Sequence, residues 1–154
     1  MNLRFGMMAL LLCATAAVAQ ESGYQFTNVA SVPTTPVKNQ AATGTCWCFA
    51  TTSFMESELL RMGKGEYDLS EMFIVRQKYI NQMEDNYYRR GQGNVGQGSL
   101  SHTWMNAFKQ VGIVPEEVYH GINYASEHHD HLELSTYVKA LADASVKLKA
   151  RSPQ

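Results

Sequence analysis

Hydrophobic residues along this chain recur at helical spacing in several segments, which are separated by stretches rich in glycine and proline. In residues 46–62 the apolar positions cover much of the helical circumference, and Gly63 follows as a C-terminal stop. These positions are Trp47, Phe49, Ala50, Phe54, Met55, Leu59, Leu60 and Met62. The pattern predicts a buried central helix that begins near Thr45.

A second helix is indicated by Asp68-Leu69-Ser70-Glu71, where Asp68 can cap the backbone and Glu71 can reach back to it. The apolar residues of this segment form a core-facing stripe: Leu69, Met72, Phe73, Ile80, Met83 and Tyr87. A cluster of glycines then ends the pattern and predicts a flexible or tightly turned loop. Its members are Gly91, Gly93, Gly96 and Gly98.

Two further helices are predicted in the second half of the chain. One covers residues 100–111 and stops at Gly112, and the other covers residues 132–149 with the stripe Leu134, Tyr137, Val138, Leu141 and Val146. Residues 20–40 contain Pro33 and Pro36 without a helical period, and this predicts an extended lead-in. Strand signals are weak throughout, so the fold class is mainly α.

The first 19 residues have the pattern of a secretory signal peptide. Arg4 precedes an apolar stretch, and the small-x-small ending Ala17-Val18-Ala19 predicts cleavage after Ala19. A membrane anchor is the alternative, but the apolar run is shorter than the roughly 20 residues that span a bilayer. The sequence therefore predicts a secreted or periplasmic protein, free of the membrane once the signal is removed.

Composition and charge narrow the class of protein further. The chain has 154 residues, 45% hydrophobic and 18% charged, which is typical of one globular domain with a core. Its 13 Lys+Arg are balanced by 14 Asp+Glu, so there is no basic excess to support nucleic-acid binding. Nucleic acid is therefore excluded as an expected partner.

Removal of residues 1–19 leaves Cys46 and Cys48, too few for a disulfide framework. Positions i and i+2 of a helix point about 200° apart, so the two thiols can neither bond each other nor share a metal comfortably. The geometry predicts different roles for them. For Cys48 the prediction is a small buried core residue.

The run His128-His129-Asp130-His131 raises the question of a metal site. Adjacent residues on a helix do not converge, and zinc ligands normally come from separate elements. We therefore expect a solvated loop or helix start, with no metal site and no cofactor. A histidine-rich metal-binding secreted protein remains an alternative.

Candidate chemistry is concentrated in residues 37–50. Cys46 is placed on the first turn of a helix, where unsatisfied backbone N–H groups favour the thiolate, which is the nucleophilic form. Gly44 lets the preceding loop approach closely, and Gln40 carries an amide six residues before the thiol. That amide and the backbone N–H of Cys46 can form an oxyanion hole, as thiol acyl transfer requires.

These residues resemble the papain-like cysteine peptidases, whose pattern of Gln, five residues, Cys-Trp, one residue, Phe and a small residue matches Gln40 to Ala50. The resemblance implies that Cys46 is the nucleophile and Gln40 the oxyanion-hole donor. It also implies that residues 20–154 form the N-terminal helical lobe of the papain-like α+β fold, with the second β lobe absent. Trp47 is then expected to pack beside the cleft, and a peptide is the expected substrate.

Within this family the chain looks most like the bleomycin hydrolase and aminopeptidase C branch. Thr43 and Gly96 stand where many papain-like enzymes have a disulfide, and residues 66–71 and 112–115 also resemble this branch. The resemblance implies aminopeptidase action and possible oligomers, and it places the substrate-backbone contacts at Gly98 and Ser99. Ser99 departs from the family's Gly-Gly pair.

In this family the histidine that acts as general base lies about 130 to 150 residues after the nucleophile. Counted from Cys46, that window begins near position 176. The orienting Asn or Asp comes later still. We therefore expect the chain to be an inactive fragment alone, because acylation needs that imidazole. A non-catalytic secreted peptide-binding or regulatory module remains the alternative.

Overall fold

The computed structural model describes residues 23–24, 26–122 and 126–148. The chain divides into two units, Met1–Ser31 and Val32–Gln154. The described residues of the first unit are exposed and form neither helix nor strand. The predicted signal peptide, residues 1–19, lies outside the described residues. The described part of the predicted lead-in, residues 20–40, contains neither helix nor strand, as expected.

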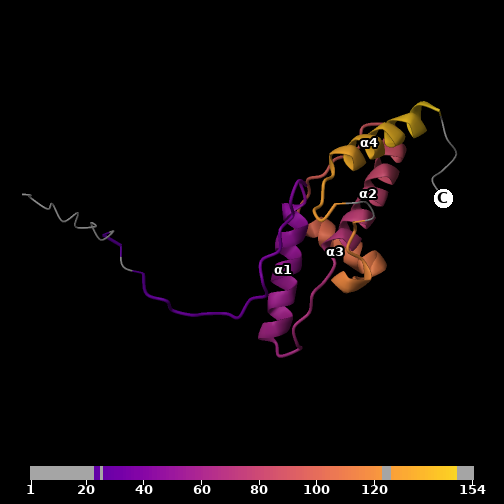
Figure 1. Ribbon diagram of the computed structural model, residues 1–154. Helices are drawn as coiled ribbons and strands as arrows, with labels where there is room; N and C mark the ends of the chain where they lie inside the picture. The colour runs from indigo at the N-terminus through magenta and orange to yellow at the C-terminus, as the bar shows by residue number, and fades with distance from the viewer. Residues whose placement is uncertain (1–22, 25, 123–125, 149–154) are drawn as a thin grey trace, which may run out of the picture. The chain divides into compact units, whose positions relative to one another are not determined.

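Within the described residues, the second unit contains four α-helices and one short 3-10 helix (Figure 1). The α-helices are α1 (Cys46–Arg61), α2 (Glu71–Tyr88), α3 (Ser101–Val111) and α4 (Leu132–Lys147), and the 3-10 helix is η1 (Glu116–Val118). No β-sheet occurs in this part of the chain, where strand-like pairing is limited to isolated bridges at Ala42–Asp130 and Leu69–Pro115. The prediction of a mainly α lobe is confirmed.

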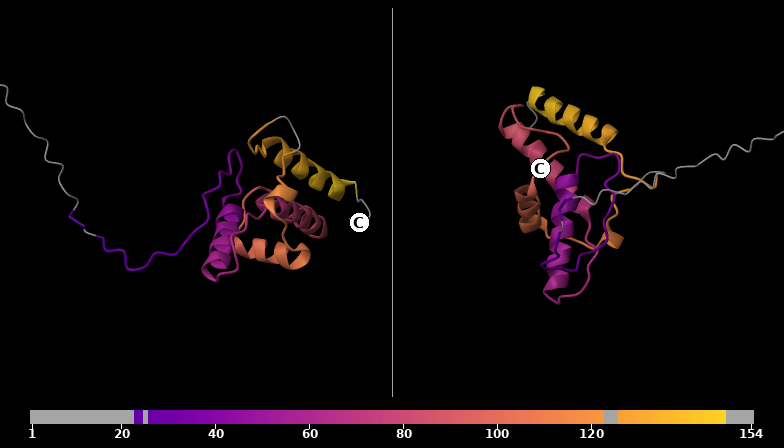
Figure 2. Two further views of the ribbon diagram at one scale, coloured as in Figure 1. Left: turned by 60° about the horizontal axis from the view of Figure 1, so that its bottom comes forward. Right: turned by 90° about the vertical axis from the view of Figure 1, so that its left-hand side faces the viewer.

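The central helix is α2, which packs against α1, α3 and α4 (Figure 2). The sequence wrongly predicted that α1 would be buried around much of its circumference. Phe54 and Met62 are 62% and 57% exposed, and besides Trp47 the buried residues of α1 are Cys48, Thr52 and Glu56. This spacing of four residues marks a single buried face, and two of its three members are polar.

The start of α2 also differs from its prediction. The N-cap is Ser70, whose Oγ accepts a hydrogen bond from the backbone N–H of Phe73 at 3.1 Å. Asp68 instead contacts Lys38 at 2.6 Å. The predicted stripe is partly wrong as well, because Ile80 is 37% exposed whereas Ile74, Val75, Lys78 and Tyr79 are buried. A helix with three neighbours buries more than one face, which a single stripe does not describe.

Helix α3 ends at Gly112, whose φ of 73° suits a residue without a side chain, and this confirms the predicted stop. The apolar residues predicted along the last helix are only partly covered, with Val138 packed against the core and Val146 half-buried. Leu134, Tyr137 and Leu141 are exposed, whereas Ala142 is buried. The reason is that α4 has its main packing contact with one helix, α2.

A single hydrophobic core joins the first three helices. Its buried members are Trp47, Cys48, Met72, Ile74, Val75, Tyr79, Trp104 and Ala107. The buried thiol of Cys48 lies 3.3 Å from the carbonyl oxygen of Glu71, and this confirms its predicted place in the core. None of the described helices is long and apolar enough to cross a membrane.

Candidate active site

Cys46 is the first residue of α1, and its side chain is exposed and not in a disulfide. Thr45 occupies the N-cap position without a side-chain cap. In the described part of the chain, the backbone N–H of Cys46 has no hydrogen-bond acceptor. The turn therefore presents an accessible thiol beside an unused backbone donor, which is the arrangement expected at an uncapped helix N-terminus.

Gln40 is fixed in the same turn by a reciprocal pair of hydrogen bonds. Its Nε2 donates to the carbonyl of Thr43 at 2.6 Å, and the Thr43 hydroxyl donates to the carbonyl of Gln40 at 2.9 Å. A side-chain amide carries two N–H donors. The bond to Thr43 uses one donor and orients the amide, so the second N–H remains for a ligand oxygen.

An ion cluster anchors the chain just before this turn. The ammonium of Lys38 lies 3.0 Å from Glu56, 3.1 Å from Glu71 and 2.6 Å from Asp68. Burial alone lowers the pKa of Lys38, but the surrounding carboxylates raise it above its ordinary value. Burial raises the pKa of Glu71 to about 7, although Lys38 opposes the shift. The cluster ties the lead-in to the middle of α1 and the start of α2.

The glycine-rich loop meets the turn from Gln40 to Cys46 through Gln97. Its Oε1 accepts from the backbone N–H of Gly44 at 2.6 Å, and its carbonyl accepts from the indole N–H of Trp47 at 3.1 Å. Gly98 is exposed, and Ser99 Oγ donates to the hydroxyl of Thr103 at 2.7 Å. The structure brings Cys46, Gln40 and Trp47 to one turn, while the substrate contacts expected of Trp47, Gly98 and Ser99 stay predictions.

Sequence reasoning missed Lys78, a buried lysine of α2. Its Nζ donates to the carbonyl of Gly96 and, at 3.0 Å, to that of Gln97. The ammonium also lies 4.6 Å from the centre of the Tyr79 ring. Burial lowers the pKa of Lys78 to about 8. The available signal was a lysine between Val75 and Tyr79, at helical spacing from apolar neighbours.

The histidine run contributes its backbone to the site. The N–H of Ala42 donates to the carbonyl of His129 at 3.0 Å, and the N–H of His131 donates to the carbonyl of Ala42 at 3.2 Å. The His131 imidazole is buried edge-on against Tyr79. Burial lowers the pKa of the His129 imidazole and that of the His131 imidazole. The described residues contain no group of three or more His, Cys, Asp or Glu placed to hold a metal. Among them, no imidazole is hydrogen-bonded to Cys46.

The model of the papain family cysteine protease matches residues 24–152. This chain belongs to the papain family of cysteine proteases. The matched range includes the whole of the turn from Gln40 to Cys46 and all four α-helices. The family resemblance drawn from the Gln40 to Ala50 pattern is thereby confirmed.

Relatives of this papain-family chain include "Cysteine proteinase 1, mitochondrial" of Saccharomyces cerevisiae, a bleomycin hydrolase, in strains YJM789, AWRI1631 and ATCC 204508 / S288c. Each is 23% identical over 118 residues, a match covering 66% of this chain and 24% of the relative. The chain spans about a quarter of the length of these curated relatives. The likeness to the bleomycin hydrolase branch is confirmed.

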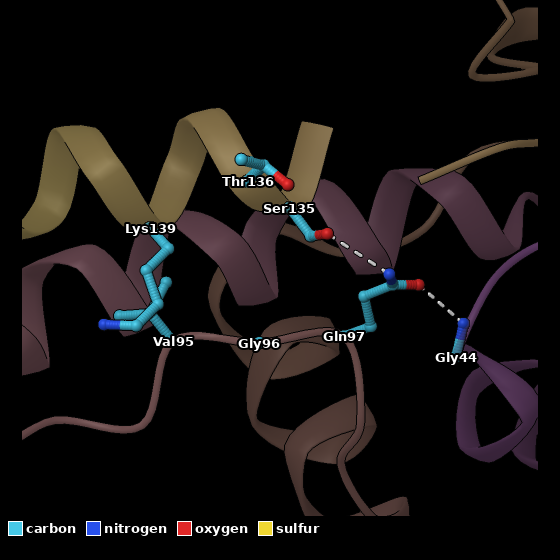
Figure 3. A pocket seen from close by; sticks show the side chains of 7 residues that line it. All are labelled: Gly44, Val95, Gly96, Gln97, Ser135, Thr136 and Lys139. Carbon is cyan, nitrogen blue, oxygen red and sulfur yellow. Dashed lines mark hydrogen bonds between the residues drawn. The ribbon is translucent and has the colours of Figure 1, made fainter. Parts of the chain in front are cut away.

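A pocket of about 640 Å³ lies beside the turn of this papain-family lobe (Figure 3). One side comes from the turn that contains Gly44 and from the glycine-rich loop, and the other from the N-terminal half of α4. Its lining residues are Gly44, Val95, Gly96, Gln97, Ser135, Thr136 and Lys139. Sequence reasoning did not place α4 next to the site, because no local pattern links residues 135–139 to Gly44.

Proposed function

We propose that this chain supplies the nucleophile and oxyanion hole of a cysteine peptidase. The observation that carries the proposal is the exposed Cys46 thiol on the first turn of α1, preceded in the same turn by the Gln40 amide that Thr43 orients. The Cys46 thiolate attacks the carbonyl carbon of a peptide bond. The backbone N–H of Cys46 and the second N–H of Gln40 then stabilise the oxyanion of the tetrahedral intermediate.

Collapse of that intermediate forms a thioester with Cys46 and expels the amine, which must take up a proton. We propose that the imidazole for this transfer is not among the described histidines. His131 is buried against Tyr79, and His120 lies 3.5 Å from Glu116. The transfer then depends on an imidazole from a second lobe, so residues 1–154 alone are expected to be inactive.

The likeness to the bleomycin hydrolase branch supports an aminopeptidase preference. Under this proposal the substrate is a peptide with a free amino terminus. An aminoacyl aldehyde is a suitable probe, because addition of the Cys46 thiol across its C=O forms a hemithioacetal whose oxygen occupies the oxyanion hole. The same aldehyde with an acetylated amine separates aminopeptidase-like recognition from general peptide recognition.

The experiment measures how well each aldehyde protects Cys46 of the full chain from iodoacetamide, with labelling read by mass spectrometry. The free-amino aldehyde should protect better than its acetylated form. Gln40→Ala should weaken this protection by about tenfold or more, since loss of one oxyanion donor costs roughly 100-fold or more in a complete enzyme. Gln92→Ala, an exposed glutamine of the glycine-rich loop, is the matched control and should leave protection unchanged.

Turnover of the corresponding aminoacyl amide should stay at background in all these proteins. Equal protection of the wild type and Gln40→Ala would contradict the proposed oxyanion hole. Cys46-dependent turnover of the amide would contradict the need for an imidazole from elsewhere. Buried Cys48 serves as an internal reference, because burial raises its pKa and keeps the thiol neutral.

A further inference from the structure

Gln97 links the turn from Gln40 to Cys46 with the start of α4. Its Oε1 accepts from the backbone N–H of Gly44 at 2.6 Å, and its Nε2 donates to the hydroxyl of Ser135 at 3.2 Å. Figure 3 shows the side chain reaching between these two partners. The same Nε2 also lies 3.5 Å from the carbonyl oxygen of His131. Both ends of the amide are therefore used, and each end contacts a different segment.

The backbone of Gln97 is fixed independently of its side chain. Its carbonyl accepts from Trp47 of α1 at 3.1 Å and from Lys78 of α2 at 3.0 Å. Gly44 permits the close approach, because an added Cβ there would lie 3.0 Å from the Cβ of Gln97. The position of Gln97 in the glycine-rich loop is therefore fixed by α1 and α2, and its side chain holds the Gly44 turn.

A second contact holds the same turn from the other side. Ala42 exchanges backbone hydrogen bonds with His129 and His131, directly before α4. Ala42 and Gly44 flank Thr43, and the Thr43 carbonyl orients the Gln40 amide. The segment that carries the oxyanion donor is therefore held on both sides of one residue, and both contacts lead to the beginning of α4.

We propose that Gln97 is a positioning residue for the active site, which couples the Gly44 turn to α4 and so holds Gln40 and the Cys46 N–H in place. This role rests on the proposed function of Cys46 and Gln40. Gln97 acts through Gly44 and does not itself touch the reacting atoms. The histidine run has a related role, because the backbones of His129 and His131 hydrogen-bond to Ala42 and hold the turn.

The test compares the full wild-type chain with Gln97→Ala, Gln97→Glu and the control Gln92→Ala. Two quantities are measured: hydrogen exchange of the Gly44 amide by NMR, and protection of Cys46 from iodoacetamide by the aminoacyl aldehyde. Gln97→Ala should speed Gly44 exchange by about tenfold, because it removes the acceptor of that amide. It should also weaken aldehyde protection by about tenfold, since small misplacements of an active-site group are costly.

The glutamate variant distinguishes positioning from general disruption of the loop. Its carboxylate can still accept from the Gly44 N–H but cannot donate to the Ser135 hydroxyl, which itself donates to the carbonyl of Leu132. Gln97→Glu should therefore restore slow exchange of the Gly44 amide. Gln92→Ala should change neither quantity. Unchanged Gly44 exchange and unchanged protection in Gln97→Ala would overturn the proposal, as would Gly44 exchange in Gln97→Glu that is as fast as in Gln97→Ala.

Failure of the proposed function has a different outcome. If the aldehyde does not protect Cys46 of the wild type, the oxyanion hole is contradicted. Gly44 exchange in the same proteins then still decides whether Gln97 holds the turn: faster exchange in Gln97→Ala alone supports the coupling, and equal exchange in all variants overturns it.

Discussion

Lys78 is fully buried, and no carboxylate of the described residues forms an ion pair with it. Its ammonium is enclosed and donates to the carbonyls of Gly96 and Gln97. The titratable groups that interact with it are Cys48, whose raised pKa keeps the thiol neutral, and His131, whose pKa is lowered. Lys78 therefore holds the glycine-rich loop by charge-assisted hydrogen bonds from its ammonium to two backbone carbonyls.

This burial predicts a specific pH dependence of stability. The pKa of Lys78 is about 8 in the folded chain and 10.5 in the reference state, so between these values the unfolded chain binds more protons. The free energy of unfolding of the wild type should therefore rise relative to that of Lys78→Met as pH increases from 8 to 10, by about 1 to 3 kcal/mol.

Denaturant unfolding of both proteins at several pH values in this range measures the difference, and the other lysines cancel in the comparison. Parallel stability curves for the wild type and Lys78→Met would show that the ammonium does not lose its proton early. Such a result would contradict the lowering of the Lys78 pKa by burial, although the hydrogen bonds to the two loop carbonyls would remain.

At the scale of elements, Glu56 of α1 binds the end of the lead-in through Thr35 and Lys38. This carboxylate is 1% exposed and accepts from Thr35 at 3.1 Å, from Lys38 at 3.0 Å and from the backbone N–H of Leu69 at 2.7 Å. Lys38 shares its charge between Glu56 and Glu71, the first residue of α2. One lysine is therefore the shared cation of the carboxylates that join the lead-in to two helices.

Replacement of Lys38 should be strongly destabilising. Lys38→Met leaves Glu56 and Glu71 buried without their cation, at a cost of about 3 to 5 kcal/mol. Burial raises the pKa of Glu71 to about 7, so the folded chain takes up this proton more readily than the unfolded chain below that pH. The destabilisation should therefore be smaller at pH 5 than at pH 8.

Lys64→Met is the matched control, because Lys64 is exposed after the end of α1. Chemical denaturation of the two variants and the wild type at both pH values gives the comparison. A loss for Lys38→Met no larger than that for Lys64→Met would mean that the cluster contributes little to stability.

The positions of the helices along the chain were largely predictable from the sequence. Which face of each helix is buried was not. Ser101–Val111 was predicted to within one residue because Gly112 terminates it, and Cys46–Arg61 began where the motif suggested. The buried face of α1 was missed because Thr52 and Glu56 are polar and find distant partners in Trp104 and Lys38. The spacing of apolar residues indicates which side chains of a helix favour burial. It does not indicate which other helices pack against that helix.

At the scale of the whole chain, the papain family could be identified from residues 40–50, because they form one local motif. The contacts of Gln97 and Lys78 could not be predicted. Gln97 reaches Gly44 and Trp47 over about fifty residues of sequence, and such a contact depends on how α1, α2 and the glycine-rich loop pack. The turn from Gln40 to Cys46 is local in sequence, but the groups that hold it come from three other segments.

In the proposed function, Cys46 is a thiol nucleophile, and Gln40 and the backbone N–H of Cys46 form its oxyanion hole. The most direct measurement is a crystal structure of the full chain with the aminoacyl aldehyde. We expect a bond from Cys46 Sγ to the aldehyde carbon, with the hemithioacetal oxygen about 2.7 to 3.1 Å from both Gln40 Nε2 and the backbone N of Cys46. An adduct whose oxygen points away from both donors, or an aldehyde bound elsewhere, would contradict it.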